Sequence, residues 1–385
     1  MVVGTRPDII RMTPLYYEFK KYPNQFEISI LHTGQHSDEN MSQTFFDQFK
    51  LPAPDYNLEA GYGSQALQTG TIMIKSEDVL LRHRPNMLFV FGDDNSSLAL
   101  SLTAAKLNIP IAHVEAGLRD FDRSTPQEIN RTIIDLVAEN FFTSCDKANL
   151  NLIKEGKDIE RVFLTGSLYA DMVKHFLPET ANLKILEQLG LEEKRYILLT
   201  FHKPGNLDNP DRLKKLSEIV SRVAEKTKMV LPLHPRTRDK LMSDDLGDLI
   251  LNNMNIKLTE PLGYLDFLKL ESSAALIMTD SGGVQEESTC LGVTCLTLRD
   301  RTERVATVSD GSNMLVDLKL DKILSQIEFC MQNNQPPKRK PFLWDGQTAE
   351  RIVKNLRNNI EFESSGLYQG ETQIPAGRAT VTVLI

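Results

Sequence analysis

The sequence predicts an α/β protein built from two Rossmann-like, doubly wound domains that face a central cleft. Short apolar segments of strand length alternate with helical segments along most of the chain. Such alternation is typical of parallel sheets that are covered by helices on both faces. The alternation stops in a charged stretch near the middle and then restarts, and 385 residues exceed what one hydrophobic core usually organises. Two domains are therefore expected.

The first domain is expected over residues 1–167, and residues 168–190 are expected to be a charged, helical linker region without a strand signal. A helix over Ser96–Leu107 follows one of the strands. The strands predicted for this domain are Met1–Val3, Glu27–His32, Met87–Phe91, Ile111–Val114, Phe141–Ser144 and Val162–Thr165.

The second domain is expected over residues 191–345, where the strand pattern restarts and then fades near residue 340. Its predicted strands are Tyr196–Thr200, Met229–Leu233, Lys257–Leu258, Leu276–Thr279 and Thr294–Leu298. Residues 361–385 form a tail to which the sequence assigns no role. Within the tail, Ala379–Ile385 alternates like an edge strand.

Composition excludes several classes of protein. The net charge of −8 argues against a protein built mainly to hold nucleic acid, which usually needs a basic face. The longest apolar runs have strand length and fall far below the ~20 residues of a membrane span. Four cysteines without a CxxC pair are typical of a reduced compartment. No signal peptide is expected, so the sequence predicts a cytoplasmic protein with no nucleic-acid or membrane partner.

The sharpest local signal for a bound anion follows the predicted strand Leu276–Thr279. That strand leads into Ser281-Gly282-Gly283 and then into a helix. Two glycines let the backbone approach an anion closely, and the N–H groups at the start of a helix point toward it. Glu287 lies one turn further, where its carboxylate can accept from ribose hydroxyls. The alternative is a plain tight turn in which Ser281 caps the helix.

A second strand-to-helix turn, Gly4-Thr5-Arg6-Pro7, opens the first domain. Pro7 suits the first helical position, and Arg6 would extend from the carboxyl end of the strand, where ligands of open α/β sheets gather. Arginine binds phosphate in a bidentate manner, although a solvated arginine is the more common case. The chain contains neither GxxxxGK[ST] nor GxGxxG, which argues against a Walker ATPase and a dinucleotide dehydrogenase.

Candidate catalytic side chains come directly after other predicted strands. Asp93 and Asp94 follow Met87–Phe91, Glu115 follows Ile111–Val114, and His202 follows Tyr196–Thr200. Each of them alone is more often a helix cap or a solvated charge, but four at strand ends in both halves favour one site. Two further histidines are less specific. His113 is either a core residue or a loop-positioning one, and His234 lies in a cationic turn near the expected phosphates.

The motifs of the two halves together resemble the non-hydrolysing UDP-N-acetylglucosamine 2-epimerases, which have the GT-B fold. The resemblance covers residues 1–355, and the matching segments occur in family order. They are Gly4-Thr5-Arg6-Pro7, Thr33-Gly34-Gln35-His36, His113-Val114-Glu115-Ala116-Gly117-Leu118-Arg119, Glu128-Ile129-Asn130-Arg131, Thr279-Asp280-Ser281-Gly282-Gly283-Val284-Gln285-Glu286-Glu287 and Arg299-Asp300-Arg301-Thr302-Glu303-Arg304.

This resemblance implies a UDP-sugar substrate, interconversion of UDP-N-acetylglucosamine and UDP-N-acetylmannosamine, a homodimer, no metal and no cofactor. It also implies a helix near 346–360 that returns to the first domain. Asp93, Glu115 and His202 match the catalytic positions of the family. The matching substrate-binding positions are Arg6, Arg11, Gln35, Arg131, His234, Ser281, Gly282, Gly283, Glu287 and Arg304.

The chain departs from the family pattern at three places. The family usually has Pro-Glu-Glu where this chain reads Pro126-Gln127-Glu128, and an amide cannot exchange a proton as a carboxylate does. The usual glutamate is also absent from His202-Lys203-Pro204-Gly205-Asn206, and Val305-Ala306 replaces the usual Pro-Glu. Glu128 is one step along a helix from position 127, which turns its side chain by ~100°.

Three other functions stay open at this point. A hydrolysing relative would release UDP and free N-acetylmannosamine, which product analysis distinguishes. A GT-B glycosyltransferase would need an acceptor, because one fold can host both chemistries. A UDP-sugar-binding protein without turnover would bind UDP tightly and leave the sugar unchanged.

Overall fold

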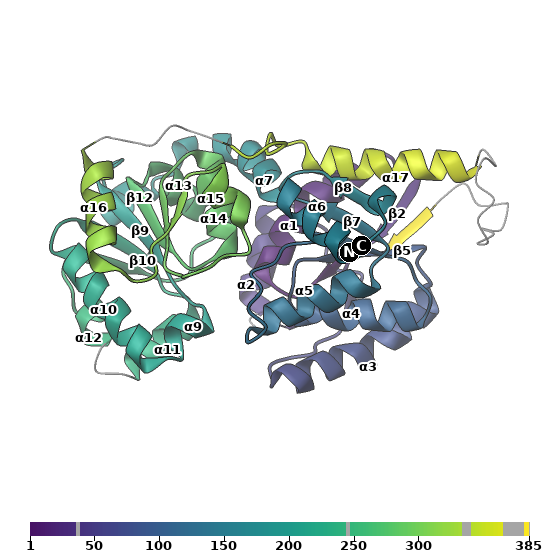
Figure 1. Cartoon of the computed structure of the whole chain (residues 1–385), viewed down its shortest axis with the longest axis horizontal. Coiled ribbons are helices and arrows are strands. Elements are labelled where there is room, and N and C mark those ends of the chain that lie inside the picture. The colour runs from purple at the N-terminus through teal and green to yellow at the C-terminus, as the bar shows by residue number, and fades with distance from the viewer. Residues whose placement is uncertain (36–38, 244–246, 333–339, 365–380, 385) are drawn as a thin grey trace. The chain divides into compact units, whose positions relative to one another are not determined.

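The computed structural model describes residues 1–35, 39–243, 247–332, 340–364 and 381–384. Its contacts divide the chain into two compact units, which we call unit 1 (Met1–Met172 with Phe342–Ile385) and unit 2 (Val173–Pro341). In each unit parallel strands alternate with helices (Figure 1). The predicted class, α/β with two doubly wound parts, is therefore confirmed. His36 and residues 365–380 of the tail lie outside the described residues.

Unit 1 contains a larger sheet with the strand order β2-β15-β5-β6-β7-β8 and a smaller one with the order β1-β3-β4. All its strand pairs are parallel. The strands of unit 1 are β1 (Val2–Val3), β2 (Phe26–Ser29), β3 (Leu31–His32), β4 (Tyr56–Asn57), β5 (Met87–Phe91), β6 (Ile111–Val114), β7 (Asn140–Thr143), β8 (Val162–Leu164) and β15 (Val381–Leu384).

Some helices of unit 1 begin at polar caps that directly follow strands or turns. Asp94 caps α4 and Thr125 caps α5, each by accepting a backbone N–H of the first turn. Helices α3, α4 and α5 lie side by side (Figure 1). The helices are α1 (Arg6–Phe19), α2 (Glu39–Gln48), α3 (Gln65–His83), α4 (Asn95–Lys106), α5 (Pro126–Val137), α6 (Asp146–Lys154), the 3₁₀ helix η1 (Ile159–Arg161), α7 (Leu168–Phe176), which continues into unit 2, and α17 (Thr348–Ser364).

Two strand predictions for unit 1 differ from the structure. The strand expected over Glu27–His32 is divided at Ile30, because the Ile30 N–H donates to Oδ2 of Asp55 at 2.7 Å instead of continuing the ladder. The end of the tail was expected to be an edge strand. Instead, β15 pairs with β2 on one side and with β5 on the other, so it is an interior strand.

The C-terminal segment belongs to unit 1. The side chain of Asp171 accepts the backbone N–H groups of Thr348 at 3.0 Å and Ala349 at 2.9 Å, which satisfies two donors at the start of α17. The indole of Trp344 donates to the carbonyl of Ser144 at 2.8 Å. From this anchored start, α17 packs against α1.

Unit 2 has one parallel sheet with the strand order β11-β10-β9-β12-β13-β14. This is the Rossmann order, and its topological switch point lies between β9 and β12. The elements are η2 (Leu177–Asn182), α8 (Ile185–Leu189), β9 (Tyr196–Thr200), α9 (Pro204–Leu207), α10 (Pro210–Ala224), β10 (Lys228–Pro232), α11 (Pro235–Met242), α12 (Asp248–Leu251), β11 (Ile256–Thr259), α13 (Tyr264–Ser273), β12 (Leu276–Thr279), α14 (Gly282–Leu291), β13 (Cys295–Thr297), α15 (Val305–Ser309), β14 (Asn313–Leu315) and α16 (Leu320–Met331).

The apolar side chains of the central strands form the core of unit 2. Ile197, Leu199, Leu276 and Met278 are fully buried, and strands that are buried on both faces read as continuous apolar runs. Among the helices of the described ranges, none combines the length and the apolar character that a bilayer crossing requires.

Candidate active site

The centre of the candidate site in unit 1 is the buried guanidinium of Arg11 on α1. Its Nη2 lies 2.6 Å from Oδ1 of Asp8, and its Nη1 lies 2.6 Å from Oε2 of Glu115. Glu115 follows β6 and adopts a φ of +68°, which is uncommon for a residue with a side chain. A Cβ at Gly92 would lie 2.2 Å from Nη1 of Arg11, so only glycine leaves room for this arginine. Arg11 therefore joins α1 to the loop that carries Glu115.

The second candidate carboxylate, Asp93, has an arginine of its own. Nη2 of Arg131 on α5 lies 2.7 Å from Oδ2 of Asp93. The Asp93 side chain is about a quarter exposed, whereas the Arg131 side chain is buried. The carbonyl of Asp93 also accepts from Nδ2 of Asn130 at 3.0 Å. These contacts from α5 hold the segment that follows β5 in place.

Two other predicted binding residues of unit 1 lie nearby in the fold. Oε1 of Gln35 accepts from the backbone N–H of Ser96 at 2.9 Å and from its hydroxyl at 2.6 Å, which ties Gln35 to the start of α4. The guanidinium carbon of Arg6 lies 4.9 Å from the ring centroid of Phe45, a cation–π contact. Gln35 serves the structure here, whereas Arg6 is only half-buried.

His113 and Asp135 connect the two loops that carry the candidate carboxylates. Both side chains are buried, and Nδ1 of His113 lies 2.6 Å from Oδ1 of Asp135. Nε2 of His113 donates to the carbonyl of Gly92 at 2.8 Å, because a carbonyl oxygen can only accept. Oδ2 of Asp135 accepts from the N–H of Gly117 at 3.0 Å. His113 is a core residue that positions both loops.

The structure also answers whether Glu128 can replace the carboxylate missing at Gln127. The two oxygens of Glu128 accept the backbone N–H groups of Asp120 and Phe121, each at 3.1 Å. Nη1 of Arg131 lies 3.4 Å from Oε2 of Glu128. Glu128 is thus engaged in closing its own loop, whereas Gln127 is half-buried beside it.

In unit 2 the candidate residues lie at the carboxyl ends of β9, β10 and β12, around the switch point. His202 follows β9, and its backbone N–H donates to the buried carboxylate of Asp280, which follows β12. The same carboxylate accepts from the N–H of Lys203 and from Nδ2 of Asn206, each at 3.0 Å. Asp280 therefore holds the loop of His202 against the start of α14.

His202 and His234 form a stacked pair of imidazole rings. Their centroids are 5.1 Å apart and their planes differ by 22°. His234 caps α11, and its Nδ1 accepts the N–H of Arg236 at 3.2 Å. The His202 side chain is about one third exposed. The two histidines predicted from the sequence are therefore direct neighbours.

The N-terminus of α14 has the features of an anion site. Ser281 is the N-cap residue of α14, and its side chain makes no capping hydrogen bond. Ser281, Gly282 and Gly283 are all partly exposed. The N–H groups of a first helical turn have no intrahelical acceptor and favour negative charge. This turn can hold a phosphate.

The cation next to this turn is Arg304, which precedes α15. A Cβ at Gly282 would lie 3.2 Å from Nε of Arg304 and 2.9 Å from Oε1 of Glu303. Nη1 of Arg304 pairs with the buried carboxylate of Glu286 on α14. Gly282 thus leaves room for a buried arginine beside the helix start, and Glu286 fixes that arginine.

Glu287 on α14 has a second carboxyl group in its vicinity, Glu271 on α13. Glu271 is fully buried, and among the described residues neither of its oxygens has a hydrogen-bond partner. Burial, together with the negative charge of Glu287, raises the pKa of Glu271 well above its ordinary value. Glu271 is therefore expected to be neutral in the folded protein.

Replacing this acid by an apolar residue is expected to stabilise the protein. Because folding raises the pKa of Glu271, stability is greatest below the ordinary value of 4.5 and is lost as the pH rises toward the raised value. We expect Glu271→Met to raise the free energy of unfolding by about 1–3 kcal/mol at neutral pH and by less in acid. Urea unfolding at both pH values tests this, with exposed Glu192→Met as the control. Destabilisation by Glu271→Met at neutral pH would contradict it.

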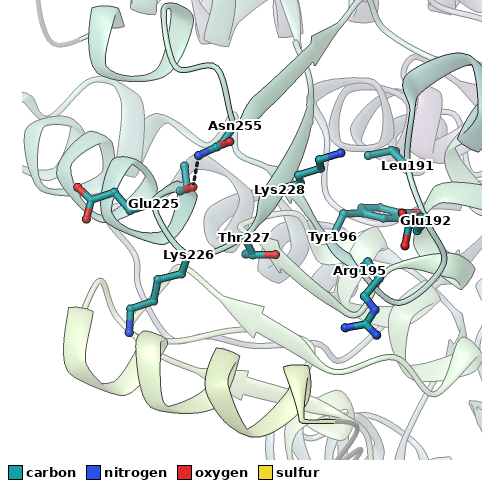
Figure 2. Close-up of a pocket in the computed structure, with 10 residues that line it drawn as sticks. Leu191, Glu192, Arg195, Tyr196, Glu225, Lys226, Thr227, Lys228 and Asn255 are labelled. Carbon is teal, nitrogen blue, oxygen red and sulfur yellow. Dashed lines mark hydrogen bonds between the residues drawn. The ribbon is translucent and has the colours of Figure 1, made fainter.

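A depression of about 500 Å³ lies elsewhere on unit 2, at the amino ends of β9 and β10 (Figure 2). Arg195, Lys226 and Lys228 line it together with Glu192 and Glu225. Ligands of doubly wound sheets gather at the carboxyl ends of the strands, so this depression is not the candidate site. Within the described part of the chain, no three His, Cys, Asp or Glu side chains gather to hold a metal ion.

Sequence reasoning missed two carboxylates that the structure makes important. Asp280 organises the loop of His202, and Asp8 accepts from the N–H groups of Gly4 at 3.0 Å and Thr5 at 2.9 Å while pairing with Arg11. One signal for Asp280 was available, because a charged residue directly after an apolar strand marks the functional end of a sheet. No such signal marked Asp8, because acidic residues are common in the first turn of a helix whether or not they have a functional partner.

Comparison with known proteins identifies the family to which the chain is similar. The family model described as UDP-N-acetylglucosamine 2-epimerase matches residues 18–357. A UDP-N-acetylglucosamine 2-epimerase of Methanocaldococcus jannaschii is 40% identical over 92% of this chain and 98% of its own. A UDP-2,3-diacetamido-2,3-dideoxy-D-glucuronate 2-epimerase of Pseudomonas aeruginosa is 37% identical over 92% of this chain and 98% of its own.

A solved structure extends the likeness to three dimensions. The crystal structure of the Methanocaldococcus jannaschii UDP-GlcNAc 2-epimerase in complex with UDP-GlcNAc and UDP superposes with a TM-score of 0.87. The match has 40% identity and covers 93% of this chain and 98% of that one. The GT-B class implied by the sequence motifs is confirmed. The chain belongs to the UDP-N-acetylglucosamine 2-epimerase family.

Proposed function

We propose that this protein interconverts UDP-N-acetylglucosamine and UDP-N-acetylmannosamine by inverting C2 of the sugar. The observation that carries the proposal is 40% identity over 361 residues with a UDP-N-acetylglucosamine 2-epimerase. The candidate residues Asp93, Glu115 and His202, kept in the order of the family motifs, support it.

The chemistry explains why carboxylates and phosphate-binding groups are needed together. The C2–H bond of the sugar has no neighbouring carbonyl and is not acidic. Departure of UDP from C1 gives that carbon oxocarbenium character, which allows a base to remove the C2 proton and leaves a glycal. Addition of a proton to the opposite face of C2, with return of UDP to C1, gives the epimer. The enzyme must therefore stabilise UDP and exchange protons on two faces.

We assign UDP binding to unit 2. The partly exposed N-terminus of α14 offers backbone N–H groups and the Ser281 hydroxyl to the diphosphate. Arg304 lies beside that turn, and Glu287 is one turn further along α14, where a carboxylate suits the ribose hydroxyls. Gly283 has no side chain, so the backbone at this position can approach the diphosphate closely. The stacked His202 and His234 supply a further polar group at the neighbouring strand ends.

We assign proton transfer at C2 to unit 1. Glu115 and Asp93 each have an ionised arginine at 2.6–2.7 Å, Arg11 and Arg131 respectively. Carboxylate oxygens are among the groups that act as the general base in such a step. Arg6 and Gln35 follow β1 and β3 of the smaller sheet, and of the two only Arg6 is left partly exposed.

Proton NMR with UDP-N-acetylglucosamine in D2O tests the proposed function. We expect new anomeric signals of UDP-N-acetylmannosamine and replacement of the C2 proton by deuterium. Free sugar with UDP would instead identify a hydrolysing enzyme. The relative from Pseudomonas aeruginosa motivates a second candidate, 2-epimerisation of a UDP-diacetamidouronate. Turnover of that sugar alone would favour the second candidate. Tight UDP binding without turnover of either sugar would overturn both.

We further propose that the protein acts as a homodimer through an exposed apolar stripe on α3. Leu67, Ile74 and Leu81 are 62%, 75% and 45% exposed and are spaced by seven residues. This spacing places them along one side of the helix. Two copies of α3 related by a two-fold axis would cover each other's stripe. A cytoplasmic location is proposed as well, because all four cysteines are free.

Placing a charge on this stripe is expected to separate the dimer. Ile74→Glu would bury a carboxylate in the apolar contact, so we expect the mass measured by light scattering to fall to that of one chain. Ile159→Glu is the matched control, because Ile159 is 66% exposed elsewhere on unit 1. A dimeric Ile74→Glu protein would show that the interface lies elsewhere.

A further inference from the structure

The depression at the amino ends of β9 and β10 has no part in the proposed epimerase chemistry, and its walls are charged. Its volume of about 500 Å³ is typical of a small-ligand site. Three exposed cationic side chains line it, those of Arg195, Lys226 and Lys228. Figure 2 shows them on three sides of Thr227. Such a lining suits an anion if the positive charge is not already neutralised by the protein.

Two of the five charged side chains that line the depression are paired with groups outside it. Nζ of Lys226 lies 2.6 Å from Oε1 of Glu328 on α16. Nη1 of Arg222 lies 3.4 Å from each carboxylate oxygen of Glu225. Each pair balances its own charge, so neither adds net charge to the depression.

The other three charged side chains leave an excess of positive charge. Within the described part of the chain, no carboxylate pairs with the guanidinium of Arg195 or with the ammonium of Lys228. Nζ of Lys228 lies 3.5 Å from the carbonyl oxygen of Gly190, which is a neutral group. Glu192 has no ion partner among the described residues either. Two cations therefore stand against one carboxylate.

The sheet holds Arg195 and Lys228 close to each other. Lys228 is the register partner of Tyr196 in the β9–β10 pair, and Arg195 directly precedes Tyr196. Neighbouring strands of a sheet lie about 4.8 Å apart, so the two backbones cannot separate. Two cations on adjacent strands without a counter-ion repel each other, and an anion bound to both replaces this repulsion by attraction. The protein thus fixes both charges before a ligand binds.

The depression is unsuited to a metal cation, because its backbone oxygens are already engaged. Helix α10 ends here, and the carbonyl of Ala224 accepts from Nδ2 of Asn255 at 2.9 Å. The carbonyl of Val223 accepts the N–H groups of Lys226 at 3.0 Å and Thr227 at 3.2 Å. The helix C-terminus would otherwise attract positive charge. The hydroxyl of Thr227, by contrast, has no partner among the described residues and can donate to an anion.

We propose that this depression binds a ligand through an oligophosphate group, either a free oligophosphate or the phosphates of a nucleotide. Arginine binds phosphate oxygens in a bidentate manner, and lysine binds them as a point charge. Because Arg195, Lys226 and Lys228 lie on different sides of Thr227 (Figure 2), a chain of phosphate groups can contact more of these cations than inorganic phosphate can.

The proposed oligophosphate site is separate from the proposed UDP site. It lies at the amino ends of β9 and β10, whereas His202 and His234 follow the carboxyl ends of the same two strands. Both sites can therefore be occupied at once, and an excess of UDP keeps the UDP site filled during a titration. The proposal holds whether or not the protein is an epimerase.

Titration calorimetry with inorganic tripolyphosphate, in the presence of excess UDP, tests the proposal. We expect Arg195→Gln with Lys228→Gln to weaken binding at least about tenfold, because two charge-assisted contacts are lost. The matched control is Lys214→Gln with Lys215→Gln, which removes the same charge from exposed positions of α10 outside the depression. It should bind as the wild type does. Glu192→Gln should tighten binding by about 2- to 5-fold, because it removes a repelling carboxylate.

Chemical acetylation of the wild-type protein locates the ligand without any substitution. Mass spectrometry measures the rate at which each lysine is acetylated. We expect tripolyphosphate to slow the acetylation of Lys228 and to leave that of Lys214 unchanged at the same ionic strength. Thermal unfolding of every variant used in the calorimetry checks that it is folded.

Titration with ATP distinguishes the two sources of the phosphate groups. Equal affinities for ATP and tripolyphosphate would assign recognition to the phosphates alone, and tighter binding of ATP would assign the site to a nucleotide; both results support an oligophosphate site. Folded wild-type protein that does not bind tripolyphosphate would overturn the proposal. Equal affinity of the Arg195/Lys228 and Lys214/Lys215 double variants would overturn it too, as would equal protection of Lys228 and Lys214 from acetylation.

Discussion

Glu115→Gln is expected to lower kcat by about 10²–10⁴-fold, because it removes a candidate base while keeping the size of the side chain. The amide can still face Arg11, so the loop after β6 should keep its conformation. UDP binding is assigned to unit 2 and should not change. Rates of C2 proton exchange in D2O, with calorimetry of UDP binding, measure the two effects separately.

Glu139→Gln is the control for this variant, since Glu139 is about half exposed and, within the described part of the chain, its side chain pairs only with the exposed Arg161. Its activity should equal that of the wild type. An active Glu115→Gln enzyme would show that the pair with Arg11 is structural and that Asp93 alone serves as the base.

Arg304→Met is expected to have the largest effect on stability. The substitution removes the guanidinium that balances the fully buried Glu286, and a buried carboxylate that loses its ion partner costs about 3–5 kcal/mol. It also removes the cation beside the N-terminus of α14, so we expect UDP affinity to fall by about 10- to 100-fold. Urea unfolding and calorimetry measure the two losses.

Arg301→Met is the matched control, because Arg301 belongs to the same loop but is about half exposed. It should change neither stability nor UDP affinity noticeably. If Arg304→Met lost stability but bound UDP normally, Arg304 would be a structural residue rather than a phosphate ligand.

The sequence predicted the strands that are buried on both faces and failed where strands are short. Met87–Phe91, Ile111–Val114, Tyr196–Thr200 and Leu276–Thr279 have the predicted bounds, because each is a short and predominantly apolar run. The two-residue β4 and the three-residue β14 carry too little pattern to be recognised. The position of β15 depends on pairing with strands that are distant in sequence, which no local pattern contains.

The sequence predicted which residues lie at the candidate site, but it did not predict which side chains they pair with. Polar residues after strands identified Asp93, Glu115, His202 and Ser281, because the carboxyl ends of parallel strands meet at one edge. The arginine assigned to each carboxylate was not predictable. The partner of Glu115 comes from α1, 104 residues away, and only the folded chain brings the two together.

The return of the C-terminal segment to unit 1 has a consequence for synthesis on the ribosome. Unit 2 is one continuous stretch, Val173–Pro341, whereas unit 1 needs Phe342–Ile385 to supply α17 and β15. Domains generally fold as units while the chain emerges. The nascent second unit can therefore complete its sheet while the first, although translated earlier, waits with an open edge at β2 and β5. The half of the protein that is made first is thus finished last.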